Sequence, residues 1–312
     1  MLINLLPDFF ALLDSSDPAA AYRRYFDAHQ RLLGAYWLNY VIEPVGPHFD
    51  DIIRTTVAAN RDDLRAMLER TDVVTLARAA EQQTRDLLSA DVDVDVILMV
   101  GVGAANAGEL VVGGKAAVFL ALEHFTGVTN PTTDGLGLDA ELIPLWLAHE
   151  YAHAVRYTSP TSRSEMRAAV DAADGFYSYW ETGRSVSLRE HLINEGIAVN
   201  VSRAVSPGHA AWEYFGYGRK QYTRIRELEA VVRQAVAGEL NGRGLGLRLK
   251  YLSDGVSEIT RTVNRSVLPE RSGYFVGARM VESAVETRGL EWTVRAAADE
   301  VAAIANAAAA TA

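Results

Sequence analysis

The sequence predicts an α+β protein that is mainly helical, with a small mixed β-sheet before a helix that carries an H-E-x-x-H motif. Apolar residues recur with helical periodicity across residues 18–90 and again across residues 209–295. Between these stretches, residues 96–122 contain short apolar runs bounded by glycines, which are typical of buried strands. Long helical stretches on both sides of a few short strands favour the α+β class.

We expect one domain over residues 1–312, since this length fits a single large domain with appended helices. Its parts are an N-terminal helical part (1–90), a sheet with the motif helices (91–206) and a C-terminal helical part (207–312). In the first part, residues 18–90 carry apolar patterns of helical period that indicate three or four helices packing on the sheet; the patterns are Tyr22, Phe26, His29 and Leu33, and then Leu64, Met67 and Leu68.

Three apolar runs are the expected strands. They are Val96–Val102, Leu110–Gly114 with its Gly113-Gly114 turn, and Ala117–Leu122. The second run is expected to lie at an edge of the sheet. All three precede the motif helix in the sequence.

Composition excludes several classes of function. The net charge is −10, the pI is near 5.2, and no basic run appears, which argues against nucleic acid or an anionic membrane as a partner. No apolar stretch reaches transmembrane length. The chain has no cysteine and therefore no disulfide framework. Residues 1–13 lack the positive start of a signal peptide, so a cytoplasmic location is expected.

The most informative feature is the segment His149-Glu150-Tyr151-Ala152-His153. Two histidines four residues apart lie on the same face of a helix, so both imidazoles can reach one metal ion. The glutamate between them can take a proton from a metal-bound water. Apolar neighbours indicate that this helix is buried, where an unpartnered His-Glu-His cluster would be costly. The motif therefore predicts a Zn²⁺ site with Glu150 as general base.

A zinc site of this kind needs a third protein ligand. A third histidine six residues after His153 is absent, because Ser159 stands there, and a cysteine ligand is excluded. A carboxylate on a second helix remains, and the capping box that begins at Ser187 predicts such a helix, closed by Pro207. Glu195 lies within its apolar stripe and needs a cationic partner. The competing acids are Glu190 and Glu181.

The two motifs together resemble the gluzincin group of zinc metallopeptidases, whose best-known member is thermolysin. His149 to Arg156 matches an H-E-x-x-H-x-x-R motif, and Glu195-Gly196-x-Ala198 matches a later E-G-x-A. The chain is most similar to a bacterial family of predicted zinc-dependent proteases, over about residues 95–290. This resemblance implies a zincin-like catalytic core with His149, His153 and Glu195 as zinc ligands. Thermolysin-like enzymes place an aspartate where this chain has Val199, so Asn200 or a backbone carbonyl would have to orient the histidines.

The resemblance also implies residues that contact the substrate. The edge strand of the sheet would pair with an extended peptide, and Asn106-Ala107 resembles a pair used there. Tyr274, in a Tyr-x-x-Gly segment that begins a late helix, is the favoured donor to the oxyanion. Other candidates for that donor are His209, Tyr214, Tyr217 and Tyr251.

The expected function is zinc-dependent hydrolysis of peptide bonds in a peptide or protein substrate. Two other functions stay open. One is a binding or sensing module that keeps the fold without cleaving peptides, although such a module has no need of Glu150. The other is a zinc amidohydrolase that acts on a small molecule, which only the width of the substrate site would distinguish.

Overall fold

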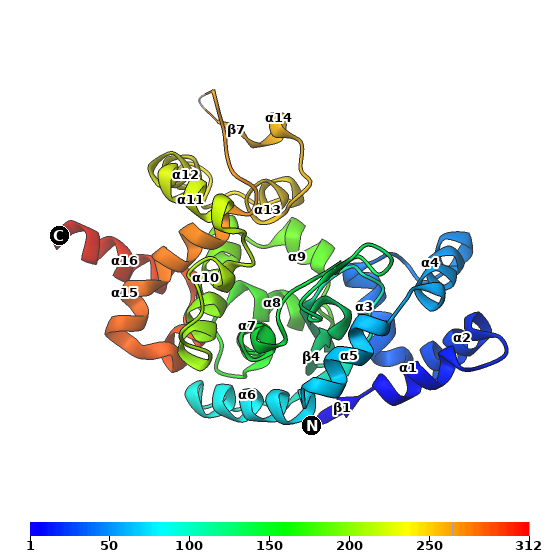
Figure 1. Cartoon of the computed structure of the whole chain (residues 1–312). Helices are drawn as coiled ribbons and strands as arrows, with labels where there is room; N and C mark the ends of the chain where they lie inside the picture. Colours follow the sequence, from blue (N-terminus) through cyan, green and yellow to red (C-terminus); the bar gives the residue numbers. More distant parts are fainter. Residues whose placement is uncertain (264, 312) are drawn as a thin grey trace.

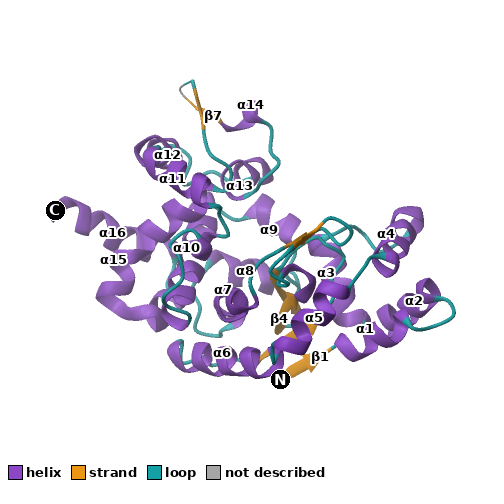
Figure 2. Ribbon diagram, viewed as in Figure 1, coloured by secondary structure: helices purple, strands orange, loops and turns teal. Residues whose placement is uncertain are grey.

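The computed structural model describes residues 1–263 and 265–311. It contains a four-stranded mixed sheet against which the helices pack. The strand order is β1 (Leu2–Asn4), β2 (Val94–Met99), β4 (Lys115–Ala121) and β3 (Ala107–Val112). β1, β2 and β4 are parallel to one another, and β3 is antiparallel to β4. The rest is mainly helical (Figure 1 and Figure 2), so the predicted fold class is confirmed.

The three predicted strands are present, and a fourth was missed. Gly113 and Gly114 both have positive φ, which allows the tight turn that pairs Val112 with Lys115. The missed strand is β1, in which Leu2 pairs with Val96 in parallel register. Three residues are too few to show any periodicity, so only the tertiary pairing reveals this strand.

The N-terminal part contains more helices than the three or four that were expected. They are α1 (Leu6–Leu13), α2 (Pro18–Ala28), α3 (Gln30–Tyr40), α4 (Gly46–Ala58), α5 (Asp62–Arg70) and α6 (Val73–Leu87). The pattern through His29 is not one helix, because α2 ends at Ala28 and His29 precedes α3. Aspartate caps begin two of the helices: Asp17 accepts from the Ala20 amide and Asp72 from the Thr75 amide.

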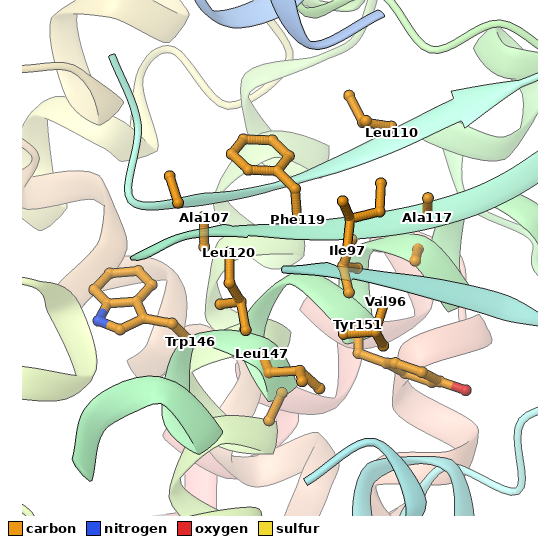
Figure 3. Packing of buried hydrophobic residues seen from close by; sticks show 14 of the residues in the cluster. Val96, Ile97, Ala107, Leu110, Ala117, Phe119, Leu120, Trp146, Leu147 and Tyr151 are labelled. Atoms are coloured by element: carbon orange, nitrogen blue, oxygen red, sulfur yellow. The ribbon is translucent and has the colours of Figure 1, made fainter. Parts of the chain in front are cut away.

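Helices cover the two faces of the sheet. Figure 3 shows Trp146, Leu147 and Tyr151 of α7 (Ile143–Thr158) beneath the strands. The ring of Phe119 points to the opposite side, where Tyr36 and Tyr40 of α3 contact it edge-on with 5.0 Å between ring centroids. Alternate side chains of β4 thus point to opposite faces of the sheet, and the motif helix α7 packs against one of these faces.

The third layer is α10 (Leu188–Val205), which lies between α7 and α15 (Ser272–Arg295). A Cβ atom on Gly196 would lie 2.2 Å from the Gly277 oxygen, and one on Gly277 would lie 2.0 Å from the Leu192 oxygen. The missing side chain of Gly196 therefore allows backbone contact with α15.

The remaining elements complete the middle and the C-terminal part of the chain. They are the 3₁₀ turns Leu122–His124, Ala140–Leu142 and Glu213–Phe215, the strands β5 (Thr129–Asn130), β6 (Gly135–Leu136), β7 (Thr262–Val263) and β8 (Ser266–Val267), and the helices α8 (Glu165–Ala172), α9 (Tyr179–Ser185), α11 (Arg219–Glu227), α12 (Glu229–Ala237), α13 (Leu245–Leu252), α14 (Glu258–Arg261) and α16 (Ala298–Thr311).

One hydrophobic core draws on all three parts of the chain, with members from Leu5 to Val301. A smaller cluster packs α12 and α13 against the start of α10 and against α15. Among the described residues, no helix combines the length and the apolar character needed to cross a membrane.

We predict that Gly277→Ala destabilises the protein strongly, because the added methyl group would collide with the backbone of α10. The cost should be about 2 kcal/mol or more, as for other overpacked core sites. The control is Gly34→Ala in α3, where no atom lies within 4 Å of the added Cβ. That change should be neutral or stabilise by up to ~1 kcal/mol through helix propensity. Urea denaturation measures both, and equal effects would contradict the close contact.

Candidate metal centre

The H-E-x-x-H motif lies in the middle of α7, and the predicted carboxylate faces it from α10. His149 and His153 are buried, as is Glu195. Oε2 of Glu195 lies 3.3 Å from Nε2 of His149 and 3.4 Å from Nε2 of His153. One ligand atom from each of the three side chains lies within 4.8 Å of the other two, so the described residues His149, His153 and Glu195 form a group that could hold a metal ion.

The distances fit a tetrahedral metal ion. Ligand atoms that each lie about 2.0–2.1 Å from a tetrahedral zinc are separated by about 3.3 Å. A charge-assisted hydrogen bond between imidazole and carboxylate would be shorter, at about 2.7–2.9 Å. Oε2 of Glu195 lies at nearly equal distances from the two imidazoles, and both distances are longer than those of such a hydrogen bond. The donor set of two nitrogens and one oxygen is the kind that holds a catalytic zinc.

The protonation of these groups also suits a metal site. Burial alone would raise the pKa of Glu195, but the two imidazoles outweigh it and lower that pKa well below its usual range. Burial lowers the pKa of His149, which favours the neutral ring that a metal needs. For His153, burial acts in the same direction, but Glu195 outweighs it and raises the pKa to about 9. A bound metal would replace that proton.

The two competing acids do not join the cluster. Glu190 is fully buried and forms an ion pair with Arg156, with Oε1 2.7 Å from Nη2. Glu181 is exposed on α9, where it pairs with Arg184. Glu181 lies in the first turn of this short helix, which Ser178 caps.

The capping box that predicted α10 is only partly formed. Ser187 Oγ accepts from the Glu190 amide at 3.2 Å, as expected for the first residue of the box. The reciprocal bond comes from another helix, because the Ser187 amide donates to Glu165 at 3.1 Å. The Glu190 side chain is thereby free to pair with Arg156 and tie α10 to α7.

Asn200 does not orient the two histidines of the motif. Its amide nitrogen donates to the carbonyl oxygens of Gly196 and Ala278. Nδ1 of both histidines is buried and has no hydrogen-bond partner among the described residues. No backbone carbonyl therefore takes the role that was considered for Asn200. Ring contacts hold the imidazoles instead. Tyr157 stacks on His153 with centroids 5.8 Å apart, and Trp146 lies 5.5 Å from His149.

A second buried carboxyl accompanies Glu150, and sequence reasoning missed it. Burial raises the pKa of Glu150 well above its usual value, and Glu109 on β3 raises it further. Glu109 accepts a 2.9 Å hydrogen bond from the Tyr40 hydroxyl. Gly108 makes this possible, because a Cβ there would lie 2.5 Å from the Tyr40 ring. One signal was available: Glu109 is the single charge in an otherwise apolar strand.

These groups surround a cavity of about 130 Å³. Its lining includes three residues that were expected to contact substrate, Asn106, Ala107 and Tyr274. Tyr274 stacks near His149 with ring centroids 6.4 Å apart, and burial raises the pKa of its hydroxyl above the usual range. The complete lining is Tyr40, Asn106, Ala107, Gly108, Glu109, Trp146, His149, Glu150, His153, Tyr177, Tyr179, Glu195, Arg248, Arg271 and Tyr274.

The other candidates for the oxyanion donor lie outside this cavity and have other partners. His209 contacts Ser206 at 2.9 Å. The hydroxyls of Tyr214, Tyr217 and Tyr251 donate to the Ser206 carbonyl, the Arg271 carbonyl and the Glu239 carboxylate, respectively. Tyr274 is therefore the candidate that the fold brings to the His149–His153–Glu195 cluster.

Sequence reasoning also missed the cations and aromatic residues of the cavity wall. Arg248 comes from α13, Arg271 from the residue before α15, and Tyr177 and Tyr179 from the segment before and at the start of α9. None of them belongs to a motif, and only tertiary packing brings them to the histidines.

Comparison of this chain with protein-family models, with curated proteins and with solved structures finds no match.

We predict that Arg156→Met costs about 3–5 kcal/mol of stability at neutral pH, because Glu190 would be left buried without its cation. The double variant Arg156→Met/Glu190→Leu should recover a large part of this loss. The penalty should shrink as the pH falls toward ~4.3, where the unfolded carboxyl also takes up a proton. Burial raises the pKa of Glu190 in the folded protein, so the folded carboxyl takes up a proton at a higher pH than the unfolded one, and the cost of the missing cation grows with rising pH. Denaturation curves of the three proteins at several pH values test it; a pH-independent loss would contradict it.

Proposed function

We propose that the chain is a zinc metallopeptidase of the gluzincin type that hydrolyses peptide bonds. The observation that carries this proposal is the placement of Glu195 Oε2 3.3 Å and 3.4 Å from the two imidazoles of the H-E-x-x-H motif. These distances suit a tetrahedral zinc with one position open to water. Glu150 lies on the same cavity, where a base for that water is needed.

His149, His153 and Glu195 would hold the metal. When bound, zinc would polarise the scissile carbonyl and lower the pKa of water at the site. Glu150 would accept a proton from the attacking water and then deliver it to the leaving amine. Burial raises the pKa of Glu150 and Glu109 raises it further, which makes the Glu150 carboxylate a stronger base toward the attacking water.

Two further parts of the cavity would position the substrate. The Tyr274 hydroxyl would donate a hydrogen bond to the oxyanion that develops on the carbonyl oxygen. Asn106 and Ala107, at the start of edge strand β3, would contact the backbone of the substrate.

One observation favours a variant of this function. The cavity of about 130 Å³ is smaller than the 300–1,000 Å³ of common ligand pockets. A zinc amidohydrolase for a small molecule would use the same ligands and the same base. Parallel assays with peptides and with small acylated amines would separate the two substrate classes. Zinc binding without any hydrolysis would favour the binding or sensing module.

We predict that the purified protein binds about one zinc per chain and that His153→Ala abolishes this binding. Glu195→Ala should lower zinc affinity by about tenfold or more, because the site keeps only two protein ligands. The matched control is Glu181→Ala, which removes an exposed glutamate that lies outside the cluster. Metal analysis after dialysis measures all four proteins. Full zinc occupancy in the Glu195 variant would remove that residue from the ligand set.

We predict that Glu150→Gln keeps the metal but loses peptide hydrolysis by about a hundredfold or more. Glutamine preserves the size of the side chain but cannot take a proton from water. Zinc content and turnover of a peptide library, measured on the same preparation, provide the test. Undiminished turnover would show that Glu150 is not the base.

A further inference from the structure

Two arginines on the wall of the metal-site cavity have no carboxylate partner. Arg248 is buried, and Arg271 is partly buried. Several other buried arginines of the chain are paired: Arg156, Arg261 and Arg295 each lie within 3.3 Å of a carboxylate oxygen. Throughout the described residues, no carboxylate lies within 4.0 Å of either cavity arginine. A buried cation without a counter-charge is costly, which favours an anion that is not part of the chain.

Neutral groups fix both guanidinium groups in place. Arg248 donates to the Tyr179 carbonyl at 2.7 Å, and its Cζ lies 3.5 Å above the Tyr179 ring. Arg271 donates to the Gly216 carbonyl at 3.3 Å and lies 4.7 Å from the Tyr274 ring. A guanidinium held by carbonyls and aromatic faces is preorganised, and it keeps donors for a planar anion.

The charge of the cavity points to the same ligand. The wall carries three carboxyl groups and two guanidinium groups. A divalent metal on His149, His153 and Glu195 would leave an excess of positive charge even with every carboxyl ionised. An anionic group on the substrate would offset this excess.

The edge of the sheet limits how much of a peptide can pair there. The Glu109 carbonyl accepts from the Tyr40 hydroxyl at 3.0 Å, and the Val111 carbonyl accepts from the Tyr177 amide at 3.0 Å. Asn39 anchors the covering segment, because its side chain bonds the Tyr177 carbonyl and the Tyr179 amide. An extended substrate can therefore pair with β3 only near its start, which favours a substrate that ends close to the scissile bond.

We propose that Arg248 and Arg271 form a carboxylate subsite that binds the free C-terminal carboxylate of a short peptide. The enzyme would then remove a C-terminal residue. This inference rests on the proposed function for the cleavage, but the binding step can be tested by itself. The same guanidinium groups would also suit an acidic side chain, and the experiment separates the two sources of carboxylate.

The test measures binding of three matched N-acetylated peptides to zinc-loaded Glu150→Gln protein by calorimetry. One peptide has a free C-terminus, the second is amidated, and the third is amidated with a glutamate as its last residue. The free acid should bind about tenfold or more tightly than the plain amide. Arg271→Gln should remove this preference and Arg271→Lys should retain part of it, whereas Arg224→Gln, an exposed control, should leave it unchanged.

The outcomes separate this inference from the proposed function. Equal binding of the free acid and the plain amide would overturn the subsite, even if the wild-type protein hydrolyses peptides. An arginine-dependent preference for the free acid would support it, even if no peptide is cleaved. Equal tightness of the free acid and the glutamate amide would assign the subsite to any nearby carboxylate and overturn the C-terminal specificity. Arg248→Gln is a second variant, and its folding is checked by circular dichroism because Arg248 also anchors Tyr179.

Discussion

The structure of the site depends on the fixed separation of α7 and α10. A metal site tolerates errors of only about 0.2 Å in its ligand distances, and the candidate ligands here come from two different helices. α15 packs against one side of α10, with close backbone contact at Gly196 and Gly277. On the other side, the buried Arg156–Glu190 ion pair joins α10 to α7, and Ser202 Oγ donates to the Leu145 carbonyl at 3.0 Å. These contacts place Glu195 between the imidazoles without help from any loop.

The parts of the site that could be predicted are those encoded by local periodicity. His149 and His153 share one helix face because helix geometry alone brings residues four apart together. Glu195 could be found because an acid in an apolar stripe needs a cationic partner. The fold class could be predicted because helical and strand periodicities are also local. Strand β1 could not be predicted, since its parallel pairing with β2 joins residues far apart in sequence. Arg248 lies within α13 and Arg271 directly before α15, and only tertiary packing brings them to the cavity, so no sequence period marks them.

The Glu109–Glu150 pair shows how the fold sets the chemistry of the motif. Burial raises the pKa of Glu150, and the nearby Glu109 carboxyl raises it further because two buried carboxylates cannot both ionise cheaply in a low dielectric. The arrangement depends on Gly108, whose missing side chain lets Tyr40 cross the strand and bond Glu109. A glycine in an edge strand thus influences the acidity of a residue on the motif helix. A motif alone therefore does not determine the proton affinity of its own glutamate.

The edge strand bears on how a substrate of the proposed enzyme would be held. Pairing along a free edge would supply several backbone hydrogen bonds regardless of the substrate sequence. Here Tyr40 and Tyr177 already bond two of the carbonyls of β3. Less orientation can come from the backbone, so more of it must come from side chains that project into a cavity of about 130 Å³. Side chains held by packing recognise particular end groups rather than any extended peptide, and this favours a narrow range of short substrates over general proteolysis.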